Sequence, residues 1–477
     1  MKREDFGPLD AEMEPLFTSA MRRALDYRQG VGAPDQLPPQ SLAEALAAFS
    51  GPTPEVGEPA LQVIDALDRL ARPGLREMVG PRFFGWVIGA SHPVGVAADW
   101  LTSAWGQNAG NATRTPAASA AEAVSAEWLL DLLDLPREAS VGFVTGATVA
   151  NFVGLAAARG ALLRKAGWDV EADGLFGAPP IEVLIGDDAH ATVFAALRYL
   201  GLGARRVSRI ATDAEGRMSP EALALALDRV QSPPLLILQA GQLNTGAFDP
   251  AARLIPLAKA KGAWVHVDGA FGLWARACPP KAELAAGFEA ADSWATDGHK
   301  WLQTPYDCGY VIVRDANAHR CAMEVTASYL PAAGEGERDP AHYVPEQSRR
   351  ARGFATWAML RHLGRSGIAA LVERHCRVAA RMAERLSSEP GVSVLNDVVL
   401  NQVAVRFGHP EPGEAGDRLT LQTVRRIQAD NRCFAGEARW RERAIMRLSV
   451  SSMATTPEEA DRACEAIVAA WRSVRES

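Results

Sequence analysis

Short apolar runs alternate with helical stretches through most of the chain, from Pro81 to about Arg365. The helical stretches, such as 219–230 and 250–262, repeat their apolar residues with the spacing of an amphipathic helix. Strand–helix alternation of this kind is typical of an α/β domain with a mainly parallel sheet, and it restricts the fold more than any other feature of the sequence. The predicted strands cover residues 141–145, 181–185, 234–240, 263–267, 293–296 and 308–313.

The two ends of the chain differ from this central part. Before residue 75, helical patterns alternate with breaks rich in proline and glycine, so this segment has little core of its own. From about Phe354, a long helix precedes two apolar runs and two further helices, an order that suggests an α+β domain. We therefore expect an N-terminal helical segment that packs on a partner subunit (1–75), a large α/β domain (76–365) and a small C-terminal α+β domain (366–477).

Composition limits the classes of function. The 477 residues are enough for two or three domains, and a net charge of −7 argues against nucleic acid as the main partner. No apolar run is long enough to span a membrane, and the first residues lack the apolar core of a secretory signal. The six cysteines form no C-x-x-C pair, and the nine histidines show no metal-ligand spacing. We expect a cytoplasmic protein with reduced thiols and no metal site.

A lysine occupies an unusual place in the predicted fold. His299 and Lys300 lie in a short turn between two predicted strands, with Trp301 and Tyr306 among the residues that flank them. An ammonium group in such apolar surroundings is poorly hydrated, and desolvation lowers the pKa of a lysine and makes its amine nucleophilic, as Schiff-base chemistry requires. A solvated surface lysine is the competing interpretation, and on this stretch alone it is the commoner one.

Polar residues also follow three predicted strands, at the edge where open α/β sheets bind ligands. Asp268 either caps the next turn or forms a buried anion that holds a pyridinium N–H. Thr145 to Thr148 open a helix whose exposed amides suit a phosphate, although many α/β proteins have such turns. His190 begins another helix. Its side chain either caps that helix or stacks on a planar ligand. By contrast, Asp249 and Pro250 are predicted to be only a helix N-cap and its first residue.

Together these groups match the needs of pyridoxal phosphate. They lie in "TGATVANFVGLAAAR", "HVDGAFG" and "GHKW…DCG", segments that resemble the group II pyridoxal-phosphate-dependent amino-acid decarboxylases. The resemblance covers about Pro81 to Met453. It implies the aspartate aminotransferase fold (fold type I), with a mainly parallel seven-stranded sheet in the large domain and a small α+β domain. It also implies pyridoxal 5'-phosphate as the cofactor, an amino-acid substrate and a homodimer with active sites at the subunit interface.

The resemblance implies a role for each matching residue. Lys300 would form the Schiff base with the cofactor aldehyde, Asp268 would keep the ring nitrogen protonated, and His190 would stack on the ring. The turn before the helix would hold the phosphate. The implied cofactor-binding residues are Gly146, Ala147, Thr148, His190, Asp268, Ala270, His299 and Lys300.

Tyr329 bears on the type of reaction. It lies 29 residues beyond Lys300, where the decarboxylases keep a loop tyrosine that returns a proton to the substrate carbon, whereas related aldehyde synthases have phenylalanine. A tyrosine that only packs at the base of the loop is the structural alternative. The resemblance therefore favours decarboxylation of an L-amino acid to an amine and CO2. An aminotransferase, a lyase or an aldehyde synthase of the same fold, or a non-catalytic cofactor-binding homologue, are the alternatives.

The substrate is less clearly indicated. "PRFFGWVIG" resembles the segment that lines the family's substrate pocket across the dimer interface, so Phe83 and Phe84 are candidates for substrate specificity. Arg447, like Arg349 and Arg350, matches a family arginine that could hold a substrate carboxylate, although surface ion pairs are the favoured interpretation of the last two. The aromatic residues slightly favour an aromatic substrate, whereas the arginines would suit an acidic one.

The chain departs from the family pattern at three places. Asp297 stands where the family often has asparagine, and a carboxylate near a phosphate is unfavourable unless it points away or accepts a hydrogen bond. Gln242 and Leu243 replace a pair of threonines, and Val149 replaces a common glutamate. These changes concern the identity of the substrate more than that of the cofactor.

Overall fold

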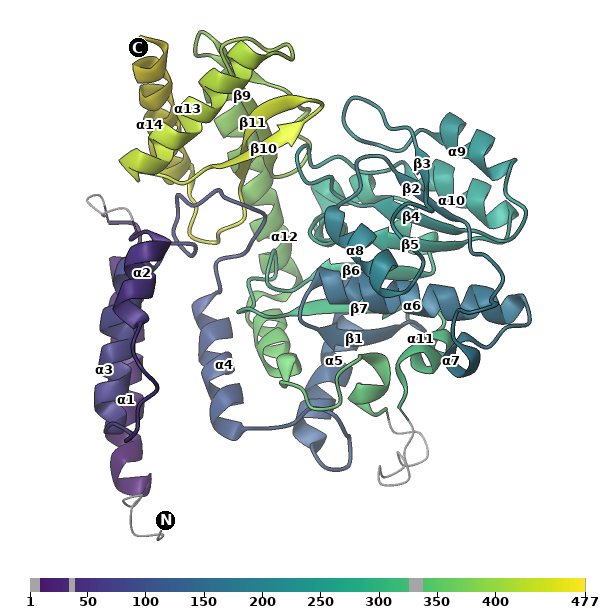
Figure 1. Ribbon diagram of the computed structural model, residues 1–477, viewed down its shortest axis with the longest axis horizontal. Coiled ribbons are helices and arrows are strands. Elements are labelled where there is room, and N and C mark those ends of the chain that lie inside the picture. The colour runs from purple at the N-terminus through teal and green to yellow at the C-terminus, as the bar shows by residue number, and fades with distance from the viewer. Residues whose placement is uncertain (1–8, 34–38, 326–337, 477) are drawn as a thin grey trace.

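The computed structural model describes residues 9–33, 39–325 and 338–476. Within these residues the strands form a seven-stranded sheet of order β1-β7-β6-β5-β4-β2-β3 and a four-stranded sheet of order β10-β11-β9-β8 (Figure 1). The predicted α/β fold with a mainly parallel sheet is confirmed. The strands of the large sheet are β1 (Ser140–Val144), β2 (Val183–Gly186), β3 (Ser208–Ile210), β4 (Leu235–Gln239), β5 (Trp264–Asp268), β6 (Ser293–Asp297) and β7 (Gly309–Val313).

The large sheet is parallel from β3 to β6, and β7 runs antiparallel to both of its neighbours. Its strands are apolar on both faces because each face carries a core. Along β4, Leu235 and Ile237 pack in one core, whereas Leu236 and Leu238 pack in the other. The helices of this part are α5 (Pro116–Leu132), α6 (Ala147–Lys165), α7 (Val170–Asp173), α8 (Ala191–Tyr199), α9 (Pro220–Leu227), α10 (Ala251–Ala260) and α11 (Ala316–Met323).

The long helix α12 (Arg352–Ser387) leads from the large sheet to the small one (Figure 1). It crosses the domain boundary predicted at residue 365, and Gly364 interrupts its helical torsion angles just before that point. Both domain boundaries stay predictions. The small sheet consists of β8 (Val392–Val394), β9 (Gln402–Phe407), β10 (Gly436–Trp440) and β11 (Arg443–Ser449), and it packs with α13 (Glu414–Asp430) and α14 (Pro457–Arg475).

The N-terminal helices are α1 (Leu9–Gly30), α2 (Leu42–Phe49) and α3 (Ala60–Ala71). Figure 1 shows them as a separate column beside α4 (Pro93–Trp105), away from both sheets. An ion pair of 2.9 Å between Arg23 and Asp68 joins α1 to α3, yet neither α2 nor α3 has a buried residue. Large apolar side chains are therefore exposed on this column: Phe17, Met21, Leu25, Leu42, Leu46, Phe49, Leu61, Val63 and Leu67.

The prediction that Asp249 caps a helix is wrong. α10 begins at Ala251 with Pro250 as its cap residue, and no side chain caps it. The buried carboxylate of Asp249 instead accepts hydrogen bonds of 2.7 Å from the backbone N–H groups of Met218 and Gln239. Its burial raises the pKa of this carboxyl group to about 6.

None of the helices in the described ranges is both long enough and apolar enough to cross a membrane.

Candidate functional site

Lys300 lies in the turn that follows β6, at the edge of the large sheet. Its Nζ atom is 2.8 Å from Oδ2 of Asp297, and the lysine side chain is only 18% exposed. The same Nζ lies 6.0 Å from the centre of the Phe271 ring. Lys300 is thus held by a carboxylate in a largely buried position, and it is not a solvated surface lysine.

A cavity of about 290 Å³ opens beside this lysine. It is formed by the N-terminus of α6, the start of α8, the end of β5 and the lysine turn. All eight residues that were predicted to bind the cofactor line it: Gly146, Ala147, Thr148, His190, Asp268, Ala270, His299 and Lys300. The structure therefore brings together side chains that are up to 154 positions apart in the sequence, from Gly146 to Lys300.

Asp268 is the negative group at the floor of the cavity. It ends β5, is almost completely buried, and accepts a hydrogen bond of 3.2 Å from the backbone N–H of Ala270. Burial raises the pKa of its carboxyl group, while nearby His190 and Lys300 favour its charged form. A buried carboxylate of this kind is stabilised by a cationic partner, and the N–H of a pyridinium ring is such a partner.

His190 both caps a helix and lines the cavity, so the two interpretations of this residue do not exclude each other. Its Nδ1 atom lies 2.7 Å from Oγ1 of Thr192 and accepts the Thr192 backbone N–H at the start of α8. Burial lowers the pKa of His190, although Asp268 opposes this effect. The ring is therefore neutral at pH 7, which suits it to stacking on a planar group.

The N-terminus of α6 provides the site for an anion. Gly146 is its cap residue and has no side chain that could cap this end of the helix. The turn is tight, since a Cβ atom on Gly146 would lie 2.9 Å from Cε1 of His299. However, the backbone N–H of Ala147 already donates to Oδ1 of Asp297 at 2.6 Å. Asp297 thus accepts a hydrogen bond, one of the two conditions under which the sequence could tolerate a carboxylate here.

These groups fit pyridoxal phosphate. Lys300 offers an amine for the aldehyde, Asp268 an anion for the ring nitrogen, and His190 a neutral ring for one face of the pyridine. The N-terminus of α6, whose cap residue is a glycine, offers backbone donors for the phosphate besides the Ala147 N–H that Asp297 accepts. Leu243 and Phe271 supply apolar lining.

Arg447 lies on β11, close enough to His190 to affect the pKa of that ring. Its side chain is buried, its Nε atom has no hydrogen-bond partner, and Nη1 is 3.4 Å from Oδ1 of Asn244. Burial lowers the pKa of the guanidinium to about 10. Within the described residues Arg447 makes no ion pair, and it is not among the residues that line the cavity beside Lys300.

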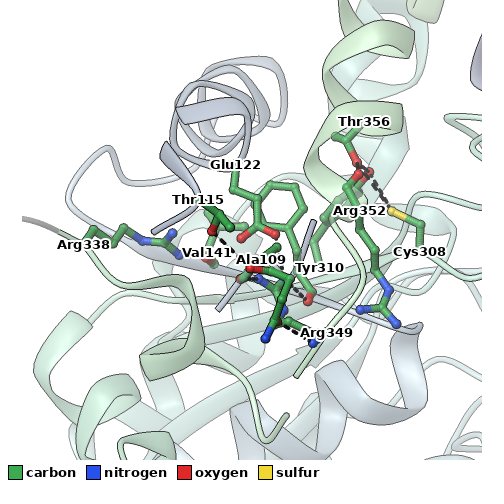
Figure 2. Close-up of polar contacts among 12 residues, drawn as sticks. Ala109, Thr115, Glu122, Val141, Cys308, Tyr310, Arg338, Arg349, Arg352 and Thr356 are labelled. Atoms are coloured by element: carbon green, nitrogen blue, oxygen red, sulfur yellow. Dashed lines mark hydrogen bonds and ion pairs between the residues drawn. The ribbon is translucent and has the colours of Figure 1, made fainter. Parts of the chain in front are cut away.

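The two arginines before α12 have different surroundings. Arg349 is completely buried and pairs with Glu122 at 2.7 Å, with each side chain 1% exposed, so its interpretation as a surface ion pair is wrong (Figure 2). It also donates to the carbonyl oxygens of Ala109 and Phe143. Arg350 pairs with Asp99 at 2.5 Å in a partly exposed position, as predicted. Neither arginine lines the cavity beside Lys300.

The aromatic candidates occupy different places from those expected within one subunit. Phe83 stacks on Phe434 with ring centres 4.9 Å apart, and Phe84 packs in the core of the small sheet. Neither lines the cavity of its own chain. Trp86 is 53% exposed, and its segment lies against the lysine turn, because the N–H of Gly89 donates to the His299 carbonyl oxygen at 2.9 Å.

Three more residues bear on the site: one that was predicted from the sequence and two that were not. Tyr329 lies outside the described residues, so its role stays a prediction. Sequence interpretation missed Thr192, which orients His190, and Asn244, which contacts Arg447. Thr192 could have been suspected because it stands two residues after His190 in a helix-start pattern, whereas no local signal marks Asn244.

Comparisons with known proteins agree with this geometry. A family model described as the pyridoxal-dependent decarboxylase conserved domain matches residues 43–408. The aromatic-L-amino-acid decarboxylase of Bacillus atrophaeus is 28% identical over 85% of this chain and 84% of that protein. The L-2,4-diaminobutyrate decarboxylase of Rhizobium meliloti (strain 1021) is 30% identical over 87% of this chain and 83% of that protein. A crystal structure of Oryza sativa TDC with PLP and tryptamine has the same fold, with a TM-score of 0.90, 23% identity, and coverage of 98% of this chain and 99% of that one.

Proposed function

We infer the activity from the premise that the chain belongs to the pyridoxal-dependent decarboxylase family. It is a pyridoxal-phosphate-dependent carboxy-lyase that converts an L-amino acid to the corresponding amine and CO2. One observation carries the assignment of its residues: Lys300, Asp268, His190 and the N-terminus of α6 surround a single cavity.

Each of these residues has a distinct task. When bound, pyridoxal phosphate supplies an aldehyde that captures amino groups and a protonated ring that accepts the electron pair left by CO2. Lys300 holds the cofactor between turnovers and takes part in the exchange with the substrate amine. Asp268 keeps the ring nitrogen protonated, and the neutral His190 ring stacks on the pyridine. Tyr329 returns a proton to the substrate Cα, which would separate a decarboxylase from an aldehyde synthase.

An aromatic amino acid is the substrate that we propose. The support comes from the relative named aromatic-L-amino-acid decarboxylase, from the apolar lining by Leu243 and Phe271, and from the exposed Trp86 beside the lysine turn. The buried Arg447 is proposed to hold the substrate carboxylate, since it lies near His190 and its Nε atom has no hydrogen-bond partner in the described ranges. Phe83 and Phe84 remain candidates only for a pocket that two subunits share.

We also propose that the enzyme is a cytoplasmic homodimer with its active sites at the subunit interface. The exposed apolar side chains on α1 to α3 would be covered by a second copy of the chain. All six cysteines are free, and five of them are buried, which suits a reducing compartment.

A mass-spectrometric product screen tests the proposed function. The purified protein, supplied with pyridoxal phosphate, would be incubated with each proteinogenic L-amino acid, and Lys300→Ala serves as the control. We expect an aromatic amine that forms only when Lys300 is present. A keto acid or an aldehyde would overturn decarboxylation but keep the cofactor site, and an amine from a non-aromatic substrate would overturn the proposed substrate class.

A further inference from the structure

We propose that Asn151, His266 and Ser293 form a positioning triad for the cofactor site. None of the three lines the cavity. Each lies in an element that ends or begins at it, and their side chains are linked to one another by hydrogen bonds. The inference rests on the proposed function only through the cofactor, because it concerns how the cofactor is held rather than which substrate reacts.

The geometry of the triad is well defined. His266 Nδ1 lies 2.8 Å from Oγ of Ser293, and His266 Nε2 lies 2.8 Å from Oδ1 of Asn151. All three residues are completely buried. Burial lowers the pKa of His266 to about 3, so the imidazole is neutral and uses one nitrogen as donor and the other as acceptor.

The direction of these hydrogen bonds follows from Asn151, whose amide oxygen can only accept. The Nε2–H of His266 therefore donates to Oδ1 of Asn151, and Nδ1 of the neutral ring accepts from the Ser293 hydroxyl. Oγ of Ser293 also accepts the indole N–H of Trp264 at 2.9 Å. The chain Trp264–Ser293–His266–Asn151 therefore has one consistent arrangement of protons, which fixes the tautomer of the histidine.

The triad joins the three elements that carry the cofactor site. Asn151 lies on α6, one helical turn after the anion-binding turn. His266 lies on β5, two residues before Asp268 and therefore on the same face of the sheet. Ser293 is paired with His266 in register at the start of β6, the strand that leads to Lys300. A shift of β5 would disturb both hydrogen bonds of His266, a shift of α6 would disturb the bond to Asn151, and a shift of β6 would disturb the bond to Ser293.

The close packing around His266 indicates that its contact with α6 is a specific feature of the fold. A Cβ atom on Gly154 would lie 2.7 Å from Cε1 and 2.9 Å from Nδ1 of His266. Only glycine at this position of α6 lets the helix approach the imidazole so closely. The amide nitrogen of Asn151 is buried without a hydrogen-bond partner, so the bond to His266 is the one polar contact made by its side chain in the described structure.

Two conservative variants each keep one of the two hydrogen bonds of His266 and remove the other. In His266→Gln, the amide nitrogen takes the place of Nε2 and keeps the bond to α6. In His266→Asn, the amide takes the place of Nδ1 and keeps the bond to β6. Both would be compared with His266→Leu, which keeps neither bond, and with the milder Ser293→Ala in case His266→Leu does not fold.

His319→Leu is the matched control. His319 is also completely buried, its pKa is also lowered to about 3, and it also lies 2.8 Å from a serine hydroxyl, that of Ser140. It joins α11 to Ser140 at the start of β1, the end of that strand away from the cavity, and its ring nitrogens contact Ser140 and the Tyr343 carbonyl oxygen rather than α6, β5 or β6. Its loss should therefore affect stability without affecting how the cofactor is held.

The readout is the affinity for pyridoxamine phosphate, which cannot form the covalent link to Lys300, measured together with the unfolding temperature. We expect His266→Leu to weaken binding by about 10- to 100-fold, as when the supports of ligating residues are removed, and His319→Leu to change it less than about twofold at a similar loss of stability. His266→Gln should recover most of the affinity, because it keeps the tie to the phosphate-binding helix. Equal effects of the two leucine variants, or wild-type affinity in His266→Leu and Ser293→Ala, would overturn the triad. Failure of the unsubstituted protein to bind the cofactor would overturn the proposed function instead.

Discussion

At the scale of single residues, Asp297 is the departure from the family pattern with the clearest physical consequence. One carboxylate oxygen accepts the Ala147 N–H, and the other pairs with Lys300. The carboxylate thus contacts both the first backbone amide of α6 and the amine of Lys300. A phosphate that enters the turn before α6 must approach a fixed negative charge, and the repulsion is strong because the site is buried.

Asp297→Asn should therefore bind pyridoxal phosphate more tightly. The amide oxygen can still accept from Ala147, whereas the negative charge is removed. We expect affinity to rise by about tenfold, or about 1.4 kcal/mol, in a titration followed by the absorbance of the bound cofactor. Asp292→Asn is the control, because Asp292 pairs with Lys259 at 2.5 Å away from the cavity. Weaker binding in Asp297→Asn would show that the carboxylate supports the cofactor instead of opposing it.

The buried histidines should make the protein less stable in acid. His319 is neutral in the folded state, where its pKa is about 3, but it takes up a proton near its ordinary value of 6.5 when the chain unfolds. Its contribution is therefore complete above pH 6.5 and is lost progressively as the pH falls towards 3. Asp249, with its pKa raised to about 6, acts in the opposite sense, since the folded state holds its proton more tightly as the pH falls from 6 towards 3.8.

Comparison of variants isolates this effect. We expect the free energy of unfolding to fall less steeply between pH 6.5 and pH 4 in His319→Gln than in the unsubstituted protein. The difference in slope should approach about 1.4 kcal/mol per pH unit, because one proton fewer is taken up on unfolding. Guanidinium titrations at three pH values in this range would measure it, and identical slopes would contradict a neutral His319.

At the scale of elements, the strands that follow from a local sequence pattern were predicted, whereas features that depend on contacts between distant residues were missed. Six of the seven strands in the large sheet were predicted because their apolar runs are buried on both faces. β3 was missed because two of its three residues are exposed, so it has no apolar run. The residues predicted to bind the cofactor lie around one cavity because the carboxyl ends of parallel strands meet at the same edge of the sheet, and their roles stay predictions.

The burial of Arg349 could not be predicted from the sequence. Its partner Glu122 lies 227 positions earlier, and nothing near either residue shows that the two meet. The packing of Phe84 in the core of the small sheet could not be predicted for a similar reason, because that sheet is formed by residues more than 300 positions away. Long-range packing overrides a local interpretation in each case.

The pair of Arg349 and Glu122 should be costly to break. It ties α5 to the segment before α12, and Arg349 also donates to the end of β1 through the Phe143 carbonyl oxygen (Figure 2). Arg349→Ala leaves a buried carboxylate without its partner, so we expect a loss of about 3–5 kcal/mol in the free energy of unfolding. Chemical denaturation would measure it. Arg350→Ala, which breaks a partly exposed pair, should cost less than about 1 kcal/mol.

At the scale of the whole molecule, we expect a second copy of the chain to cover the N-terminal column. Its helices have many exposed apolar side chains and no core of their own. Phe17→Glu on α1 should therefore weaken association of two chains while leaving the folded subunit intact, because Phe17 is 58% exposed. Analytical ultracentrifugation would measure the shift from dimer to monomer. Phe176→Glu is the control, since Phe176 is 99% exposed and lies far from α1 in the fold, and an equal shift in both variants would contradict the proposed interface.

The long helix α12 belongs to two cores at once. Its first half packs in the core of the large sheet through Met359, Leu360 and Ile368, and its second half packs in the core of the small sheet through Val378, Met382 and Leu386. Melting of either core would unwind a helix that the other core needs. We therefore expect one cooperative transition in calorimetry, with equal calorimetric and van't Hoff enthalpies per folding unit, and two separated transitions would contradict it. The small sheet carries Arg447 and Lys300 follows a strand of the large sheet, so the shared helix also means that heat should not displace the guanidinium while leaving the amine in place.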